Sequence, residues 1–136
     1  MTGRLTRLNP GELHETPGYH HITVVEAGRT AHLAGQCPLD SAGTLVGAAD
    51  LVAQVDQVVA NTRIALAAVA ARPEDVVRSV IYVRSDDRAD LSAAWERLTT
   101  SPIGAAFTSA STLLGVSRLG FPGQLVEVDF TVALPG

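Results

Sequence analysis

Apolar and polar residues alternate near both ends of the chain, as they do in half-buried β-strands. The alternation predicts strands at Leu5–Leu8, His20–Ala27, Thr30–Gly35, Val76–Arg84, Ser111–Val116 and Leu125–Leu134. Gly28 can supply the positive φ of a tight turn, so strands 20–27 and 30–35 are expected to form a hairpin. The segment Pro38–Gly47, with Asp40, Gly43 and Gly47, is expected to be a loop.

Between these strands, the repeat of apolar residues changes to helical spacing. It predicts a long helix over Asp50–Ala71, ended by Arg72-Pro73 because proline disfavours helix in the residue before it. The apolar stripe consists of Leu51, Val55, Val58, Val59, Thr62, Leu66 and Val69, and the residues mostly off it are Gln54, Gln57, Asn61 and Arg63. A second helix is predicted over Asp87–Thr100, with Leu91, Trp95 and Leu98 on one side.

The order of these elements predicts a single α+β domain over residues 1–136, with a mixed β-sheet and two helices on one face. The last strand shows the expected division. Its apolar side is Val126, Val128, Phe130 and Val132, and its mixed side is Leu125, Glu127, Asp129, Thr131 and Ala133. The mixed side either meets another subunit or faces water as in many antiparallel sheets.

Composition limits the partners. Of the residues, 46% are hydrophobic and 18% charged, which favours a folded chain over a disordered one. The net charge is −4 and the arginines are scattered, so we expect neither nucleic acid nor a membrane as a partner. Cys37 is the single cysteine and no apolar run follows the basic segment Met1–Pro10, so we expect a cytoplasmic protein.

The histidines do not predict a metal site. Neighbouring residues on a strand point to opposite faces, so His20 and His21 cannot readily bind one ion, and His14 and His32 belong to other segments. His21, which shares a face with Thr23, could instead line a pocket with Tyr19.

Several segments resemble the Rid (reactive-intermediate deaminase, YjgF/RidA) family in their order and spacing, over about Pro17 to Ala133. They are Gly18-Tyr-His-His-Ile, Ala34-Gly-Gln-Cys-Pro-Leu-Asp40, Gly43-Thr-Leu-Val-Gly47, Gln54 to Asn61, Pro73-Glu-Asp-Val-Val-Arg-Ser-Val-Ile-Tyr-Val83, Ser111-Thr-Leu-Leu-Gly-Val-Ser-Arg-Leu119 and Leu125-Val-Glu-Val-Asp129. The resemblance implies a chorismate-mutase-like fold and a homotrimer with a small-molecule cleft at each subunit interface. It also implies hydrolysis of reactive imines or enamines without a cofactor.

Hydrolysis of an imine needs a held substrate, a positioned water and a proton route to nitrogen. In deaminating members an arginine clamps the substrate carboxylate, and its position falls on Ser111 here, which cannot form a salt bridge. This places the chain in a branch without that arginine and weakens the case for 2-imino acids. Arg118 belongs to a later Arg-Leu feature of the family; it either substitutes for the missing clamp or bonds to backbone or a neighbouring carboxylate at the strand end. Ser92 replaces an asparagine that many members have.

By the same resemblance, Glu127 is the candidate catalytic residue that holds or activates water. Burial at an interface would suit it for this role, although a salt bridge between subunits is the alternative. Asp129 lies two residues further on the same face and could share a proton with it. The candidate substrate-binding residues are Gly35, Gln36, Ser111, Thr112, Tyr19 and His21; Cys37 lines the cleft or is a small buried hydrophobe.

Three hypotheses follow. The first is a deaminase that acts on a small imine or enamine whose carboxylate matters less than in the arginine-bearing branch. The second is a trimeric protein that binds or senses a small metabolite without catalysis. The third is a packing partner for another enzyme.

Overall fold

A computed structural model describes residues 4–136; residues 1–3, which begin the basic N-terminal segment, lie outside it. The described chain forms six strands, two α-helices and two short 3-10 helices. In chain order these are β1 (Leu5–Leu8), β2 (Ile22–Val25), β3 (Thr30–Gln36), α1 (Leu51–Ala68), η1 (Pro73–Asp75), β4 (Val76–Arg84), α2 (Arg88–Thr99), η2 (Gly104–Thr108), β5 (Ala110–Val116) and β6 (Val126–Ala133).

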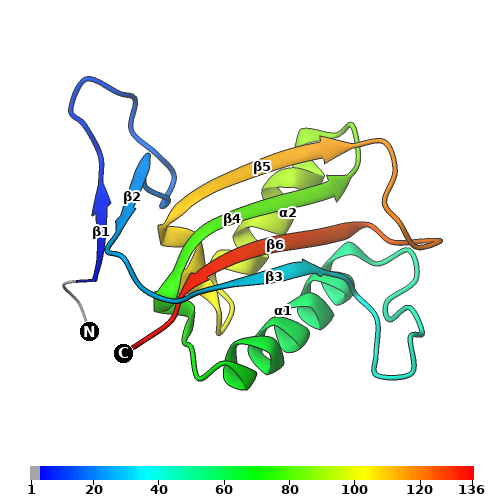
Figure 1. Cartoon of the computed structure of the whole chain (residues 1–136). Coiled ribbons are helices and arrows are strands. Elements are labelled where there is room, and N and C mark those ends of the chain that lie inside the picture. The colour runs from blue at the N-terminus through cyan, green and yellow to red at the C-terminus, as the bar shows by residue number, and fades with distance from the viewer. Residues whose placement is uncertain (1–3) are drawn as a thin grey trace.

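Four strands form the main sheet, in the order β3-β6-β4-β5. β6 runs antiparallel to both β3 and β4, whereas β4 and β5 are parallel and joined through α2. Figure 1 shows α1 and α2 side by side behind this sheet, with no helix on its front face. The predicted α+β fold, with a mixed sheet and both helices on one face, is therefore confirmed.

The core lies between the helices and the sheet, because each element contributes one apolar side. In β6, Val126, Val128, Phe130 and Val132 are all buried there, while Glu127, Asp129 and Thr131 on the other side are half-exposed. The predicted alternation is confirmed except at Ala133, which is buried as well. The sheet therefore presents a face without a covering layer, which we call the open face.

The structure ends α1 at Ala68, three residues before the predicted end. Ala70 adopts a φ of 55°, and the amides of Ala70 and Ala71 bond to the carbonyls of Ala67 and Leu66. This closes the last turn in the pattern that usually places glycine at position 70. The helix thus stops before Pro73 acts, and Val69 lies outside it and exposed rather than in the buried stripe.

The predicted hairpin between residues 20–27 and 30–35 is wrong. β2 pairs with β1, in a separate two-stranded ribbon, and β3 pairs with β6. Gly28 does not adopt the positive φ that a tight hairpin turn needs. Instead, the hydroxyl of Thr23 accepts a bond from the amide of Ala110, 2.8 Å away, which holds β2 at the start of β5.

Two arginines fasten the ribbon to the rest of the chain. Arg4 donates to Asp75, which is almost fully buried, at 3.0 Å and to the carbonyl of Leu134 at 2.9 Å. Arg7 donates to the carbonyl of Glu74 at 3.0 Å. A two-stranded ribbon is barely stable in water by itself, so these contacts hold it in place.

Candidate functional site

Two carboxylates of β6 stand on the open face of the sheet, next to the bend in β3. Glu127 pairs across the ladder with Tyr82 of β4, and Asp129 pairs with Val80. On the other side, the pairing between β3 and β6 shifts between Leu33 and Gln36, so the chain bulges in the stretch that holds Ala34 and Gly35. Bulge and carboxylates together form what we call the acidic cluster.

Gly35 leaves the space that these carboxylates occupy. A Cβ at Gly35 would lie 2.0 Å from Oε2 of Glu127 and 2.8 Å from Oδ1 of Asp129, far inside van der Waals contact. Both oxygens therefore converge on one point above the Gly35 backbone. Gly35 does not adopt a positive φ, so steric room rather than backbone conformation explains the glycine.

The other oxygen of Glu127 is held by donors. Its Oε1 accepts a bond from Nε2 of Gln124 at 3.1 Å and from the thiol of Cys37 at 3.3 Å. Burial of Cys37, followed by its hydrogen bond to Glu127 and the charge of Glu127, raises the thiol pKa to about 11. Cys37 is thus a neutral donor at physiological pH, not a nucleophile.

Tyr82 performs the same role for Asp129. Its hydroxyl donates to Oδ2 of Asp129 at 3.0 Å. Burial raises the pKa of Tyr82, and the hydrogen bond to Asp129 adds to the effect. Each carboxylate therefore has one oxygen tied to a neighbour and one directed towards Gly35.

Ser111 and Thr112 lie on opposite faces of β5, because side chains alternate along a strand. Ser111 pairs with the buried Ser79 on the helix side, and their hydroxyls are 2.7 Å apart. Thr112 pairs with Val80, so it shares the open face with Asp129, and Nη2 of Arg78 donates to its hydroxyl at 2.7 Å. Within one chain, Ser111 and Glu127 are on different sides of the sheet.

Ser111 and Thr112 instead line a hollow at the outer edge of β5, which we call the edge pocket. It measures about 350 Å³ and is lined by Pro17, Tyr19, Trp95, Ser111, Thr112 and Leu113. The rings of Tyr19 and Trp95 meet edge to face with centroids 6.1 Å apart, and the indole donates to the carbonyl of Pro17 at 3.2 Å. The pocket is small, aromatic and lined by no charged residue.

The structure thus sorts the expected site residues into two groups. Gly35 and Glu127 meet at the acidic cluster, whereas Gln36 pairs with Val128 of the helix side and its amide donates to the carbonyl of Ala34 at 2.9 Å. Tyr19, Ser111 and Thr112 gather at the edge pocket. His21 is not among the residues that line the edge pocket; its ring meets those of Tyr19 and His14, and its Nε2 is 2.8 Å from the carbonyl oxygen of His14.

Sequence reasoning missed Gln124 and Tyr82, which hold the two carboxylates. The strand pattern could have identified Tyr82, because its alternation places this side chain on the same face of the sheet as Glu127. Gln124 had none, because it sits in the predicted turn before the last strand and yet is fully buried. Arg118 is exposed and lines a separate hollow, together with Arg84 and residues 119–124. Ser92 is exposed on α2.

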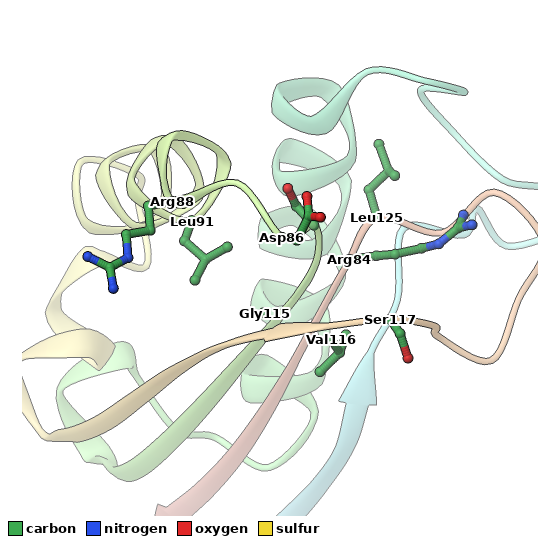
Figure 2. A pocket seen from close by; sticks show the side chains of 9 residues that line it. Arg84, Asp86, Arg88, Leu91, Gly115, Val116, Ser117 and Leu125 are labelled. Atoms are coloured by element: carbon green, nitrogen blue, oxygen red, sulfur yellow. The ribbon is translucent and has the colours of Figure 1, made fainter.

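A larger hollow, of about 650 Å³, lies at the carboxyl ends of β4 and β5. Figure 2 shows that Arg84 and Arg88 extend from it in opposite directions, with Asp86 between them. Its charged groups do not converge, so we do not take it as the site. Within residues 4–136, no three His, Cys, Asp or Glu side chains gather as metal ligands would, and neither helix is long and apolar enough to cross a bilayer.

Comparison with known proteins agrees with this fold. The sequence model of the family described as Endoribonuclease L-PSP matches residues 12–134. Protein DfrA of Myxococcus xanthus is 33% identical over 113 residues, which cover 82% of this chain and 81% of DfrA.

Solved structures extend the likeness. YyfB of Yersinia pestis, described as a protein of unknown function of the conserved Rid protein family, is 34% identical with a TM-score of 0.86. The match covers 96% of this chain and 99% of YyfB. RidA of Psychrobacter sp. PAMC 21119, at 22% identity and a TM-score of 0.62 over 89% of this chain and 92% of RidA, shares the fold. The chain therefore belongs to the Rid/YjgF family, whose sequence model is described as Endoribonuclease L-PSP.

Proposed function

We propose that the protein is a cofactor-independent deaminase that hydrolyses a small imine or enamine in a cleft between copies of a homotrimer. The observation that carries this proposal is the acidic cluster: Oε2 of Glu127 and Oδ1 of Asp129 converge above Gly35 while their partner oxygens are tied. A fixed carboxylate with one free oxygen suits general base catalysis, because it can take a proton from water.

In the proposed reaction, the water oxygen adds to the imine carbon while Oε2 of Glu127 accepts one water proton. That proton is delivered to the nitrogen, which gives a carbinolamine. The carboxylate then takes the remaining hydroxyl proton and passes it to the nitrogen as the carbon–nitrogen bond breaks, so that a carbonyl compound and ammonia leave. Asp129, whose free oxygen points to the same place, is the second group able to carry the proton. No electrons are transferred, so the step needs no redox partner.

A cleft between copies is proposed because one chain does not bring the two groups together. The edge pocket lies at the outer side of β5, and the acidic cluster lies on the open face of β6 and β3. A neighbouring copy that packs its edge pocket against this face would enclose a substrate between aromatic walls and Glu127. Exclusion of water would also strengthen the electrostatic effect of the carboxylates.

The edge pocket favours a substrate without a carboxylate. None of its lining residues is charged, and the nearby guanidinium of Arg78 donates to the Thr112 hydroxyl. The Ser111 hydroxyl is engaged by Ser79, with the carbonyl of Ser109 3.1 Å away. A charge-assisted bond to a substrate carboxylate is therefore not provided at the position where related deaminases have arginine. The aromatic walls suit a small neutral or aromatic imine.

RNA cleavage, which the description of the family model names, is less favoured for this chain. The net charge of −4 and a cluster of two carboxylates would repel a phosphodiester backbone.

The test measures imine lifetime directly. An amine oxidase generates the imine in the presence of semicarbazide, and hydrolysis by the protein reduces semicarbazone formation. We expect micromolar protein to accelerate hydrolysis of an imine without a carboxylate more than that of 2-iminopropanoate. Glu127→Gln should reduce turnover about a hundredfold or more, the usual contribution of a general base.

Glu96→Gln serves as the matched control, since Glu96 is an exposed glutamate on α2 with no side-chain role in the site. Full activity of Glu127→Gln would refute the mechanism. If the wild-type protein accelerates no imine but retains one in equilibrium dialysis, the second hypothesis, a trimeric binding protein, replaces the enzyme. The uncharged, aromatic edge pocket is the observation that keeps this alternative open.

A further inference from the structure

Gln124 is a polar side chain with no exposed surface, located in the turn that leads into β6. Its Nε2 uses both hydrogens, one for the carbonyl of Val126 at 3.0 Å and one for Oε1 of Glu127 at 3.1 Å. Its Oε1 accepts a bond from the amide of Phe121 at 3.1 Å. Every major hydrogen-bonding group of this amide is therefore used inside the protein.

The backbone determines which end of the amide faces Glu127. If the Gln124 amide were turned over, its NH₂ group would face the N–H of Phe121, and two donors would be opposed. Its oxygen would at the same time face the Glu127 carboxylate, and two acceptors would be opposed. Gln124 can thus approach Glu127 only as a donor.

The turn that carries Gln124 is itself held by a second buried glutamine. Gln54 of α1 donates to the carbonyls of Gly47 and Gly123, at 3.1 and 3.0 Å, and accepts from the amide of Leu125 at 2.7 Å. Gly123 and Leu125 are the neighbours of Gln124 on either side. The position of the Gln124 backbone is therefore fixed from the helix layer.

These contacts leave the two oxygens of Glu127 unequal. Oε1 has two donors, Gln124 and Cys37, of which the thiol is the weaker. Oε2 has no hydrogen-bond partner among residues 4–136 and lies above the Gly35 backbone. As long as Oε1 stays bonded to its donors, Oε2 is the oxygen of Glu127 that an approaching water can reach.

We infer that Gln124 is a positioning residue for the proposed hydrolysis: it holds Oε1 of Glu127 so that Oε2 is the oxygen that takes the proton from water. This inference rests on the proposed function. Gln124 does not line the edge pocket, so it acts through Glu127 and not on the substrate.

The test is Gln124→Met, which keeps the size of the side chain and removes both donors. We expect kcat to fall about tenfold and KM to stay within about twofold, because geometry at the reacting atoms changes while the pocket does not. A high-resolution crystal structure of the variant should show the Glu127 carboxylate in more than one position.

Thr62→Val is the matched control for loss of a buried hydrogen bond. Thr62 is fully buried and donates only to the carbonyl of Val58 in its own helix, so Thr62→Val should lower Tm without changing kcat. If Gln124→Met does not fold, Gln124→Asn keeps an amide that is too short to reach Glu127 and should show the same kcat loss.

The outcomes separate the inference from the proposed function. If Glu127→Gln loses activity while Gln124→Met keeps the wild-type kcat, the inference is wrong and the proposed function stands. If the wild-type protein has no activity, the proposed function fails. The crystal structure of Gln124→Met then decides by itself whether Gln124 positions Glu127. A single, unchanged Glu127 conformer in Gln124→Met would then overturn the inference.

Discussion

At the scale of single residues, the acidic cluster depends on the absence of a side chain at Gly35. A methyl group there would overlap the end of the flexible Glu127 side chain, which can move aside without unfolding the protein. We predict that Gly35→Ala lowers kcat about a hundredfold, as displacement of a reacting group by about 1 Å does, with only a small change in Tm. Gly28→Ala is the control, because nothing lies near a Cβ at Gly28.

Cys37 reports on the charge of the cluster. Because burial and then Glu127 raise its pKa to about 11 from 9.0, the folded protein should be alkylated by iodoacetamide about a hundredfold more slowly at pH 8 than after unfolding in urea. Glu127→Gln should increase the rate. The raised pKa also stabilises the fold below pH 9, and this contribution is lost as pH rises towards 11. Equal alkylation rates in folded wild type and Glu127→Gln would show that the Glu127 carboxylate does not raise the pKa of the Cys37 thiol.

The C-terminus of α1 offers a prediction at the scale of the element. Ala70 holds a φ of 55°, where a Cβ costs about 1 kcal/mol and glycine fits freely. Ala70→Gly should therefore raise stability by about 0.5–1 kcal/mol in urea unfolding. Ala67→Gly, one turn earlier within the helix and exposed, should instead lower it by about 1 kcal/mol. Destabilisation by both changes would mean that Ala70 is not left-handed in solution.

The ion pair that holds the β1–β2 ribbon is buried, so its contribution to stability can be compared with that of an exposed pair. Arg4 and Asp75 retain side-chain exposures of 13% and 6%, whereas Arg97 and Asp56 retain 49% each. Arg4→Met leaves a buried carboxylate without its cation and should cost about 3 kcal/mol. Arg97→Met should cost less than about 1 kcal/mol. Similar costs, measured by denaturant unfolding, would contradict the anchoring role of Arg4.

Sequence patterns predicted the elements that their own apolar periodicity determines. Both helices and the two-faced β6 follow from local spacing, and so does the placement of Glu127 with Asp129. The hairpin at Gly28 was wrong because pairing with β1 and β6 depends on residues far along the chain. Gln54 was expected off the buried stripe, yet partners as distant as Gly123 bury it. Burial of a polar side chain is decided by such distant partners, which local periodicity does not contain.

At the scale of the whole molecule, the uncovered sheet face is expected to meet neighbouring copies. We predict that sedimentation equilibrium gives a mass three times the 14.2 kDa of one chain at micromolar concentration. The mutation Asp129→Arg, which places a bulky cation on the open face, should shift the protein towards monomers. Ile64→Arg, at an exposed position of α1 on the helix side of the sheet, is the control. A wild-type monomer would leave the edge pocket and the acidic cluster apart.

The most direct measurement is a crystal structure of Glu127→Gln with a slowly hydrolysed imine bound. Our account predicts that the imine lies between two copies, with residue 127 and Gly35 of one copy on one side and Tyr19 and Trp95 of the other copy on the opposite side. A ligand held by residues of a single chain, or residue 127 directed into bulk water away from it, would contradict the account.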